Sequence, residues 1–180
     1  FFNPDGTPKS AGTTLKNPQY AQTLTAIAEK GAVAFYQGDI AQDIIDTVQN
    51  APGNPGVLAQ SDFNAYQIKQ REPVCVAYQN YDVCGMGPPS SGALTVGQIL
   101  AISEHYDLKG WGAESAKSWQ VIADASRLAF ADRGKYMADQ DYVPMPTAGL
   151  LDADYLKERA SLIEVGKALP EASAGNPPWS

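Results

Sequence analysis

The spacing of apolar residues predicts that most of this chain is helical. Apolar side chains recur every three or four residues, which places them on one face of a helix, and polar residues separate these runs. Asn17 followed by Pro18 is typical of a helix start. The asparagine side chain accepts a hydrogen bond from the first turn, and proline lacks the N–H group that would stay unpaired there. Helices are predicted to begin at or near Asn17, Gly38, Leu94, Ser115 and Asp152.

The same pattern predicts which faces of two central helices are buried. Residues 94–102 are apolar nearly all round, so we expect this helix to be buried. In the long helix after Ser115 we expect an inner face formed by Trp119, Ile122, Ser126, Ala129 and Phe130. Its more solvent-exposed side or its end carries Arg127, Asp132, Arg133 and Lys135.

Residues 68–86 predict a β-hairpin. The two strands lie on either side of the loop Gln79-Asn80. A two-residue loop places Cys75 opposite Cys84 in a non-hydrogen-bonded pair, with Cα atoms about 4.5 Å apart. This separation permits a disulfide, which would indicate an oxidising compartment. The alternative is a pair of small buried thiols.

Turn-forming and proline-rich stretches lie on both sides of the helical region. Residues 1–16 are a turn-rich lead-in. Residues 17–163 form a helix-rich region that contains the hairpin at about 68–86. Residues 164–180 are predicted to form an extended and mobile tail, because prolines interrupt them and their apolar periodicity is weak. The predicted fold class is α+β, rich in helix.

The composition mainly excludes classes of function. The 180 residues carry 13 Lys and Arg against 20 Asp and Glu, a formal charge of -7, and no basic run that would bind nucleic-acid phosphates. No stretch of about 18 apolar residues is present to span a membrane. One histidine and two cysteines are too few for a zinc site built from Cys and His ligands. We therefore expect a globular domain with no nucleic-acid partner, no membrane span, no metal and no cofactor.

Two candidate sites lie at helix ends. His105 follows the helix over residues 94–102, and a helix C-terminus favours a cation, so His105 is either a capping histidine or a general base. Ser90 and Ser91 precede the same helix. They either cap it or offer hydroxyl and backbone donors to an anion. No Gly-x-Ser-x-Gly motif accompanies His105, so a Ser-His-Asp triad is not indicated.

Acidic residues suggest two further sites. Asp139, Gln140 and Asp141 place side-chain oxygens at alternate positions, but the glycine and the terminal glutamate of a calcium-binding loop are missing. Asp132 and Arg133 are adjacent at the end of the long helix, where we expect an ion pair or an anchor of the helix terminus. The residues by themselves therefore yield no complete active site.

Three segments, residues 17–43, 87–100 and 128–142, resemble the gamma-glutamyltranspeptidase family in order and spacing. In that family a Pro-Pro-Ser-Ser-Gly-Gly loop leads into a helix, and an Ala-Asp-Arg helix end precedes an Asp-rich loop. Ala93 replaces the second glycine of the loop in this chain. The resemblance implies structural roles for the matching motif positions, which are Pro88, Pro89, Ser90, Ser91, Gly92, Asp132 and Arg133.

The resemblance implies an N-terminal-nucleophile hydrolase whose precursor cuts itself. This chain corresponds to the C-terminal half of the large subunit, part of a four-layer αββα fold that the small subunit completes. The new N-terminal threonine of the small subunit supplies the nucleophile and its α-amine the base, so neither a histidine nor a cofactor is required. That threonine would follow Ser180, and the arginine that holds the substrate carboxylate would precede Phe1. The resemblance therefore assigns no catalytic and no substrate-binding residue to this chain.

The implied reaction cleaves a γ-glutamyl amide such as glutathione and passes the acyl group to water, an amino acid or a peptide. Cephalosporin acylases, which cleave a glutaryl-type side chain, belong to the same family and are one alternative. A non-catalytic scaffold or binding module of this fold, stably folded and monomeric, is another. The resemblance and the Cys75–Cys84 pair together indicate a periplasmic or secreted protein.

Overall fold

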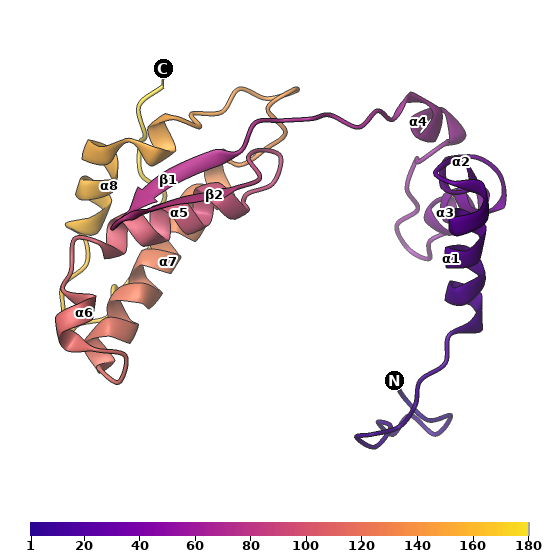
Figure 1. Cartoon of the computed structure of the whole chain (residues 1–180), viewed down its shortest axis with the longest axis horizontal. Coiled ribbons are helices and arrows are strands. Elements are labelled where there is room, and N and C mark those ends of the chain that lie inside the picture. Colours follow the sequence, from indigo (N-terminus) through magenta and orange to yellow (C-terminus); the bar gives the residue numbers. More distant parts are fainter. Residues whose placement is uncertain (180) are drawn as a thin grey trace. The chain divides into compact units, whose positions relative to one another are not determined.

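Two units follow one another along the chain in the computed structural model, which describes residues 1–179. The first unit is Phe1–Lys69 and the second is Gln70–Ser180 (Figure 1). Their boundary lies inside the helix-rich region 17–163 that the sequence patterns had treated as one stretch. The main apolar cluster draws its buried residues from positions 94 to 163, so it forms within the second unit.

The first unit consists of short helices that contact their neighbours in sequence. They are α1 (Pro18–Lys30), α2 (Val33–Tyr36), α3 (Asp39–Gln49) and α4 (Gln60–Ala65). Helix α1 contacts α2, α2 contacts α3, and α3 contacts α4. The predicted start of α1 is confirmed, because the Asn17 side chain accepts a hydrogen bond from the Tyr20 N–H at 2.9 Å. Among the described residues of this unit, the buried apolar ones are Ala41 and Ile45 of α3.

Residues 1–16, which precede α1, are rich in turns. The Gly6 N–H donates to the Asn3 carbonyl oxygen at 3.0 Å and closes a tight reversal. Phe2 and Pro8 form an isolated β-bridge across it. The sequence pattern had predicted turns over residues 1–16.

The second unit begins with the hairpin formed by β1 (Val74–Tyr78) and β2 (Tyr81–Gly85). The strands are antiparallel with the predicted register, so that Cys75 lies opposite Cys84. The Sγ atoms of these two cysteines are bonded, and their Cα atoms are 4.1 Å apart. Side chains alternate along β1 between half-buried and exposed, as expected for a sheet with one packed face.

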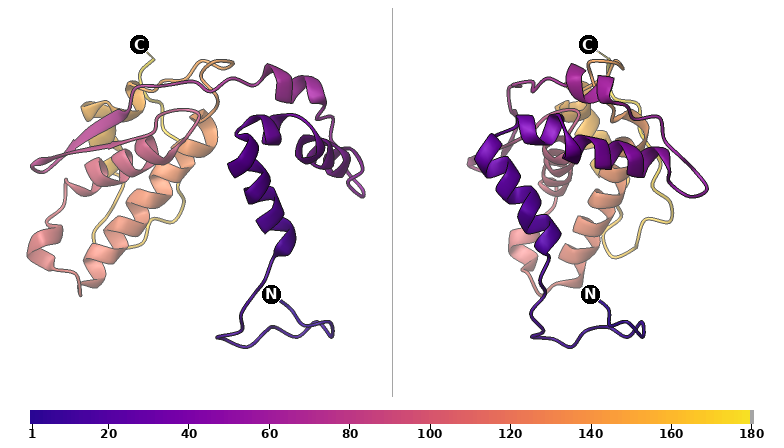
Figure 2. Two further views of the ribbon diagram at one scale, coloured as in Figure 1. Left: turned by 45° about the vertical axis from the view of Figure 1, so that its right-hand side comes forward. Right: turned by 90° about the vertical axis from the view of Figure 1, so that its right-hand side faces the viewer.

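Helix α5 (Gly92–Ser103) is the centre of the second unit. It contacts both strands, α7 (Ala116–Tyr136), α8 (Ala153–Ala160) and the 3-10 turn η1 (Gly149–Leu151). Figures 1 and 2 show the hairpin lying along this helix. The short helix α6 (Leu108–Trp111) packs on α7. Large apolar residues of the core include Leu94, Ile102, Val121, Leu128, Leu150 and Leu156. The expectation of a buried helix holds for most of α5, although Val96 is 47% exposed.

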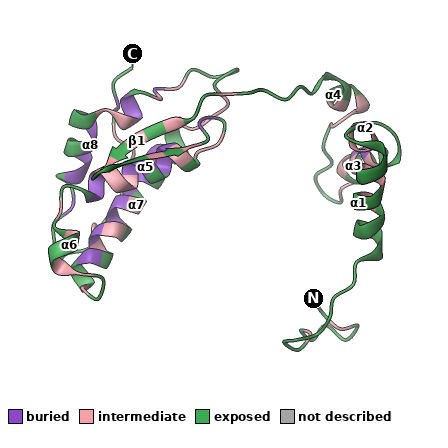
Figure 3. Cartoon of the chain, viewed as in Figure 1, coloured by how far each residue is buried: buried purple, intermediate pink, exposed green. Residues whose placement is uncertain are grey.

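The inner face of α7 differs from the prediction. Trp119 and Phe130, predicted to face the core, are 62% and 57% exposed. Figure 3 shows the buried stripe that α7 presents instead, formed by Ser118, Val121, Asp124, Ala125, Leu128, Ala129 and Asp132. Asp132, which the sequence had placed on the wetter side, is 0% exposed. Ala129 is buried as predicted, but the predicted face was centred on the two aromatic residues and left out Val121, Ala125 and Leu128, which form the packed stripe.

The tail, of which the structure describes residues 164–179, is extended but held in place. It contains turns and no regular helix or strand over the described positions, and it runs back along the second unit (yellow in Figures 1 and 2). Side chains of α7 and α8 bind its backbone. The prediction of a mobile tail did not include these partners, which come from helices distant in the sequence.

The helix-rich α+β class is confirmed by these elements, helices together with one two-stranded sheet across the described residues. Over residues 1–179, no helix is both long enough and apolar enough to cross a membrane.

Candidate functional site

The proline pair of the family motif lies in the loop that joins β2 to α5. The Pro88–Pro89 peptide bond is cis. Gly87 and Pro88 are buried, whereas Pro89 and Gly92 are exposed. A turn closes here, because the Ser90 N–H donates to the Gly87 carbonyl oxygen at 3.0 Å. The loop thus presents the start of α5 next to the end of α7.

The serine that follows this loop binds an arginine of α7. Ser91 occupies the position that precedes α5, but its hydroxyl makes no capping hydrogen bond. Instead Ser91 Oγ accepts a hydrogen bond from Arg133 Nε at 2.8 Å. The same guanidinium lies 5.9 Å from the centre of the Phe130 ring. The expectation that the Ser91 hydroxyl caps the helix is corrected, because the hydroxyl binds the charged donor of Arg133 instead.

Asp132 and Arg133, adjacent in sequence, face different partners. The Asp132 carboxylate forms a buried ion pair with Arg159 of α8, with 3.1 Å between Oδ1 and Nη2. Successive residues of a helix point about 100° apart, so an ion pair between positions 132 and 133 is disfavoured. The predicted pairing of the two residues is therefore wrong, whereas Asp132 does anchor the end of α7.

Asp132 is the centre of a group of buried side chains that we call the polar cluster, formed by Gln98, Asp132, Tyr155 and Arg159. Its Oδ2 atom accepts hydrogen bonds from the Tyr155 hydroxyl at 2.7 Å and from Gln98 Nε2 at 3.1 Å. Its Oδ1 atom faces Arg159 and also accepts from the Gly175 N–H at 2.8 Å. Four donors therefore surround one carboxylate that is shielded from water, which is the arrangement that a buried charge requires.

The buried surroundings of Tyr155 favour its protonated phenol. Burial, and after it the hydrogen bond to Asp132, raises the pKa of the Tyr155 phenol well above its ordinary value. Tyr155 is therefore a permanent hydrogen-bond donor at neutral pH. The Tyr155 hydroxyl donates this hydrogen bond to Asp132 and so helps to satisfy the buried carboxylate.

A second carboxylate of α7, Asp124, binds the tail further along. It accepts hydrogen bonds from the Leu169 N–H at 3.0 Å, from Gln120 Nε2 at 2.8 Å and from Arg127 Nη1 at 3.1 Å. Burial raises the pKa of Asp124, but these three donors outweigh it and hold the pKa below the ordinary value of 3.8. Asp124 is therefore ionised at neutral pH and attracts the backbone of the tail.

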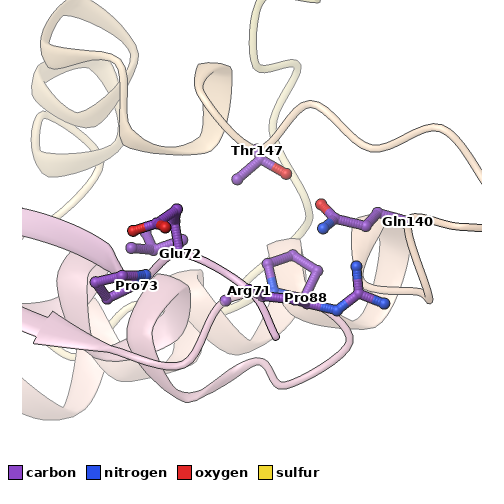
Figure 4. Close-up of a pocket in the computed structure, with 8 residues that line it drawn as sticks. Arg71, Glu72, Pro73, Pro88, Gln140 and Thr147 are labelled. Carbon is purple, nitrogen blue, oxygen red and sulfur yellow. The ribbon is translucent and has the colours of Figure 1, made fainter. Parts of the chain in front are cut away.

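A cavity of about 350 Å³ lies beside the proline loop (Figure 4). Figure 4 shows Gln140 and the Arg71 guanidinium together at one end, with Glu72 at the other end. The acidic turn predicted as a poor calcium loop supplies the partners of this arginine. Arg71 Nη2 lies 2.6 Å from Asp141 Oδ2 and 3.8 Å from Asp139 Oδ1. The cavity is lined by Arg71, Glu72, Pro73, Val74, Gly87, Pro88, Gln140 and Thr147.

His105 belongs to none of these groups. It lies in the turn after α5 and is exposed, and its N–H donates to the Ile102 carbonyl oxygen at 3.3 Å. The bonded Cys75 and Cys84 lie on the exposed face of the hairpin. Within residues 1–179 no cluster of three or more metal-ligating side chains is found.

Comparison with known proteins decides which family these residues represent. Residues 1–179 match the family described as gamma-glutamyltranspeptidase. The chain belongs to the gamma-glutamyltranspeptidase family. The glutathione hydrolase proenzyme of Escherichia coli K12 is 38% identical over 172 residues, which are 96% of this chain and 29% of that protein. The acylase ACY 1 proenzyme of Pseudomonas sp. strain SE83 is 36% identical, over 92% of this chain and 29% of its own length.

Solved structures of gamma-glutamyltranspeptidase family members resemble this chain as well. The Helicobacter pylori gamma-glutamyltranspeptidase matches with a TM-score of 0.77 and 33% identity, over 97% of this chain and 50% of that one. The cephalosporin acylase of Bacillus halodurans matches with a TM-score of 0.71 and 25% identity, over 89% of this chain and 29% of that one. The chain thus spans less than a third of the curated relatives' length.

Sequence reasoning missed the partners of Asp132. The spacing Tyr155–Arg159 places both residues on one face of α8, since side chains four residues apart are neighbours on a helix. Asp132 also continues the i, i+4, i+7 series of Val121, Ala125 and Leu128. A charged residue in register with an apolar stripe indicates a buried carboxylate, and this pattern was available in the sequence.

Proposed function

We propose that this chain is part of the large subunit of a self-processing γ-glutamyltranspeptidase-like enzyme. The complete enzyme cleaves γ-glutamyl amides such as glutathione and transfers the γ-glutamyl group to water, an amino acid or a peptide. The observation that carries this proposal is the family match over residues 1–179. It is supported by relatives named glutathione hydrolase proenzyme at 36% and 38% identity.

The reactive groups, in this proposal, lie outside the chain. A threonine of the small subunit, made from the same precursor, supplies both the nucleophilic hydroxyl and the α-amine that accepts its proton. The geometry favours a structural role, and not a catalytic one, for the residues of this chain. The carboxylate of Asp132 is saturated with internal donors, and His105 is exposed. Helices α5, α7 and α8 would then cover one face of the stacked sheets of a four-layer αββα core.

The proposal is tested by comparing two proteins with one γ-glutamyl-p-nitroanilide assay. The complete precursor should divide into two chains and release nitroaniline, whereas the 180-residue chain alone should release none. A precursor in which the threonine that opens the small subunit is replaced by alanine is the matched control, and it should stay intact. Turnover by the purified 180-residue chain, retained after a further purification step, would overturn this assignment and place a nucleophile within it.

A cephalosporin acylase is the second candidate function, favoured by the acylase ACY 1 relative at 36% identity. Glutaryl-p-nitroanilide carries the acyl group that such an enzyme would prefer. Because both substrates release the same chromophore, the ratio of the two kcat/KM values compares the acyl groups directly. A higher kcat/KM for the glutaryl substrate than for the γ-glutamyl substrate would assign the enzyme to the acylases.

We also propose that the protein is periplasmic or secreted. The bonded pair Cys75–Cys84 supports this location, because disulfides persist in oxidising compartments and are rare in the cytosol. Fractionation of cells that express the complete gene should recover the protein outside the cytoplasm. Recovery with cytoplasmic marker enzymes and with both thiols free would contradict it.

A further inference from the structure

The tail is bound along its described length by side chains of two helices. Gln120 of α7 accepts from the Gly166 N–H at 2.9 Å and donates to the Lys167 carbonyl oxygen at 3.1 Å. Asp124 and Arg127 bind the backbone at Leu169. Because these partners lie on successive turns of α7, the tail is aligned with the helix axis.

Near residues 173–175 the tail backbone binds the polar cluster and Tyr136. The Gly175 N–H donates to Asp132 Oδ1 at 2.8 Å, and the Tyr136 hydroxyl donates to the Gly175 carbonyl oxygen at 2.6 Å. Arg159 Nη2 donates to the Ser173 carbonyl oxygen at 2.8 Å. Both polar groups of the Gly175 backbone are therefore used, one of them by a buried charge.

Two glycines allow this close approach. A Cβ atom on Gly175 would lie 2.5 Å from the Tyr155 hydroxyl oxygen and 2.9 Å from its ring. A Cβ atom on Gly149, in η1, would overlap the backbone carbonyl of Pro178. Real side chains do not tolerate such distances, so a larger residue at Gly175 displaces the tail from α8, and a larger residue at Gly149 displaces it from η1.

We propose that Asp132 is a positioning residue for self-processing, and that Gly149 and Gly175 set the path along which it holds the tail. The inference rests on the proposed function, in which the precursor breaks a peptide bond beyond Ser180. In that step a threonine hydroxyl attacks the preceding carbonyl carbon, the C–N bond breaks, and the hydroxyl proton ends on the released amine. Water then hydrolyses the resulting ester to a carboxylate and regenerates the hydroxyl, so the net change is one water added across the peptide bond.

Attack within one chain is fast only when the hydroxyl and carbonyl are held in near-attack geometry. A displacement of about 1 Å at the reacting atoms costs up to about 100-fold in rate. Anchoring Gly175 to Asp132, and passing Pro178 against Gly149, removes most of the freedom of the residues that lead to the broken bond. The Tyr136–Trp179 ring contact, with centres 6.4 Å apart, continues the same path.

The test uses the complete precursor with three single replacements, Gly149→Ala, Gly175→Ala and the control Gly134→Ala. Gly134 is exposed on α7, and a Cβ atom there meets nothing within 4 Å. Self-cleavage of the precursor into two chains, called division below, is followed on denaturing gels over time. We expect Gly149→Ala and Gly175→Ala to slow it by roughly 10- to 100-fold, and Gly134→Ala to leave its rate unchanged.

Two further measurements separate positioning from a loss of folding. Turnover per processed molecule should stay within about twofold of the wild type, because each replacement acts on the tail before the bond breaks. Amide hydrogen exchange of the peptide that contains Gly175 should be faster in Gly149→Ala and in Asp132→Asn than in Gly134→Ala. If amide exchange at Gly175 becomes faster in these variants but their precursors cleave themselves at the wild-type rate, the inference is overturned.

The outcomes distinguish this inference from the function on which it rests. Division of Gly149→Ala and Gly175→Ala at the wild-type rate overturns the positioning role and leaves the proposed enzyme intact. A wild-type precursor that never divides overturns the proposed function, and the inference with it. Equal losses of division and of turnover per processed molecule would show a general structural defect, which also overturns it.

Discussion

Replacing Arg159 by methionine should destabilise the protein far more than the loss of an ordinary ion pair. Methionine keeps an unbranched apolar stem of similar length but removes the guanidinium. The Asp132 carboxylate, 0% exposed, would then remain buried without its counter-ion. The hydrogen bonds to Leu128 and Ser173 would be lost as well.

The magnitude follows from the burial of the pair. Removing one partner of a buried ion pair costs about 3–5 kcal/mol, because the remaining charge is left uncompensated. For a protein of this size each kcal/mol lowers the midpoint of thermal unfolding by roughly 2–4 °C. We therefore expect Arg159→Met to lower that midpoint by about 6–20 °C.

The assay is thermal unfolding followed by circular dichroism, with Lys167→Met as the matched control. Lys167 forms an ion pair with Glu164, but those side chains are 70% and 73% exposed, so its loss should change stability by less than about 1 kcal/mol. The double variant Asp132→Asn with Arg159→Met removes both charges and should be more stable than additivity of the single variants predicts. A cost below about 1 kcal/mol for Arg159→Met, equal to the control, would refute the reasoning.

Three other predictions concern single contacts. Because the pKa of Asp124 is lowered in the folded protein, its stabilisation of the tail is complete above about pH 4 and is lost as the pH falls through that lowered pKa; hydrogen exchange at the Leu169 amide should accelerate there and not between pH 6 and 8. Replacing both Cys75 and Cys84 by serine should cost about 2–3 kcal/mol in urea unfolding, because the bond closes a short loop, and an unchanged midpoint would contradict this. Tyr106→Phe should cost about 1–2 kcal/mol, since the Tyr106 hydroxyl lies within hydrogen-bond distance of the carbonyl oxygens of Ala160, the last residue of α8, and of Ile163; an unchanged stability would show that water replaces this hydroxyl.

Some of this fold follows from short stretches of sequence. The start of α1 depends on Asn17 and Pro18, and the register of the hairpin depends on the two residues between its strands. In both cases the interacting groups lie within about ten residues of one another, so local rules suffice. The family motifs likewise identified the chain from contiguous residues.

The apolar register of α7 indicates that Asp132 is buried, but the partners of the buried carboxylates could not all be predicted in the same way. Asp132 binds groups of α5, α8 and the tail, whereas Asp124 binds the tail and also Gln120 and Arg127 of its own helix. Local rules assign a charged residue to water unless its partner is known. Asp132 was therefore placed on the wet side of α7, and Trp119 and Phe130 were placed inside, where the structure shows the reverse. The exposure of those two aromatic residues depends on which neighbours cover α7.

The sequence by itself determined the five longer helices, the helix starts at Asn17 and Asp152, the hairpin register that places Cys75 opposite Cys84, and membership of the family. Only the tertiary structure decided that Asp132 lies among Gln98, Tyr155, Arg159 and the backbone of Gly175, and that the tail is held against α7. The physical reason is how far apart in the sequence the interacting groups lie. Caps and turns are satisfied by neighbouring residues, whereas a buried charge is stabilised by donors that folding brings together from distant parts of the chain.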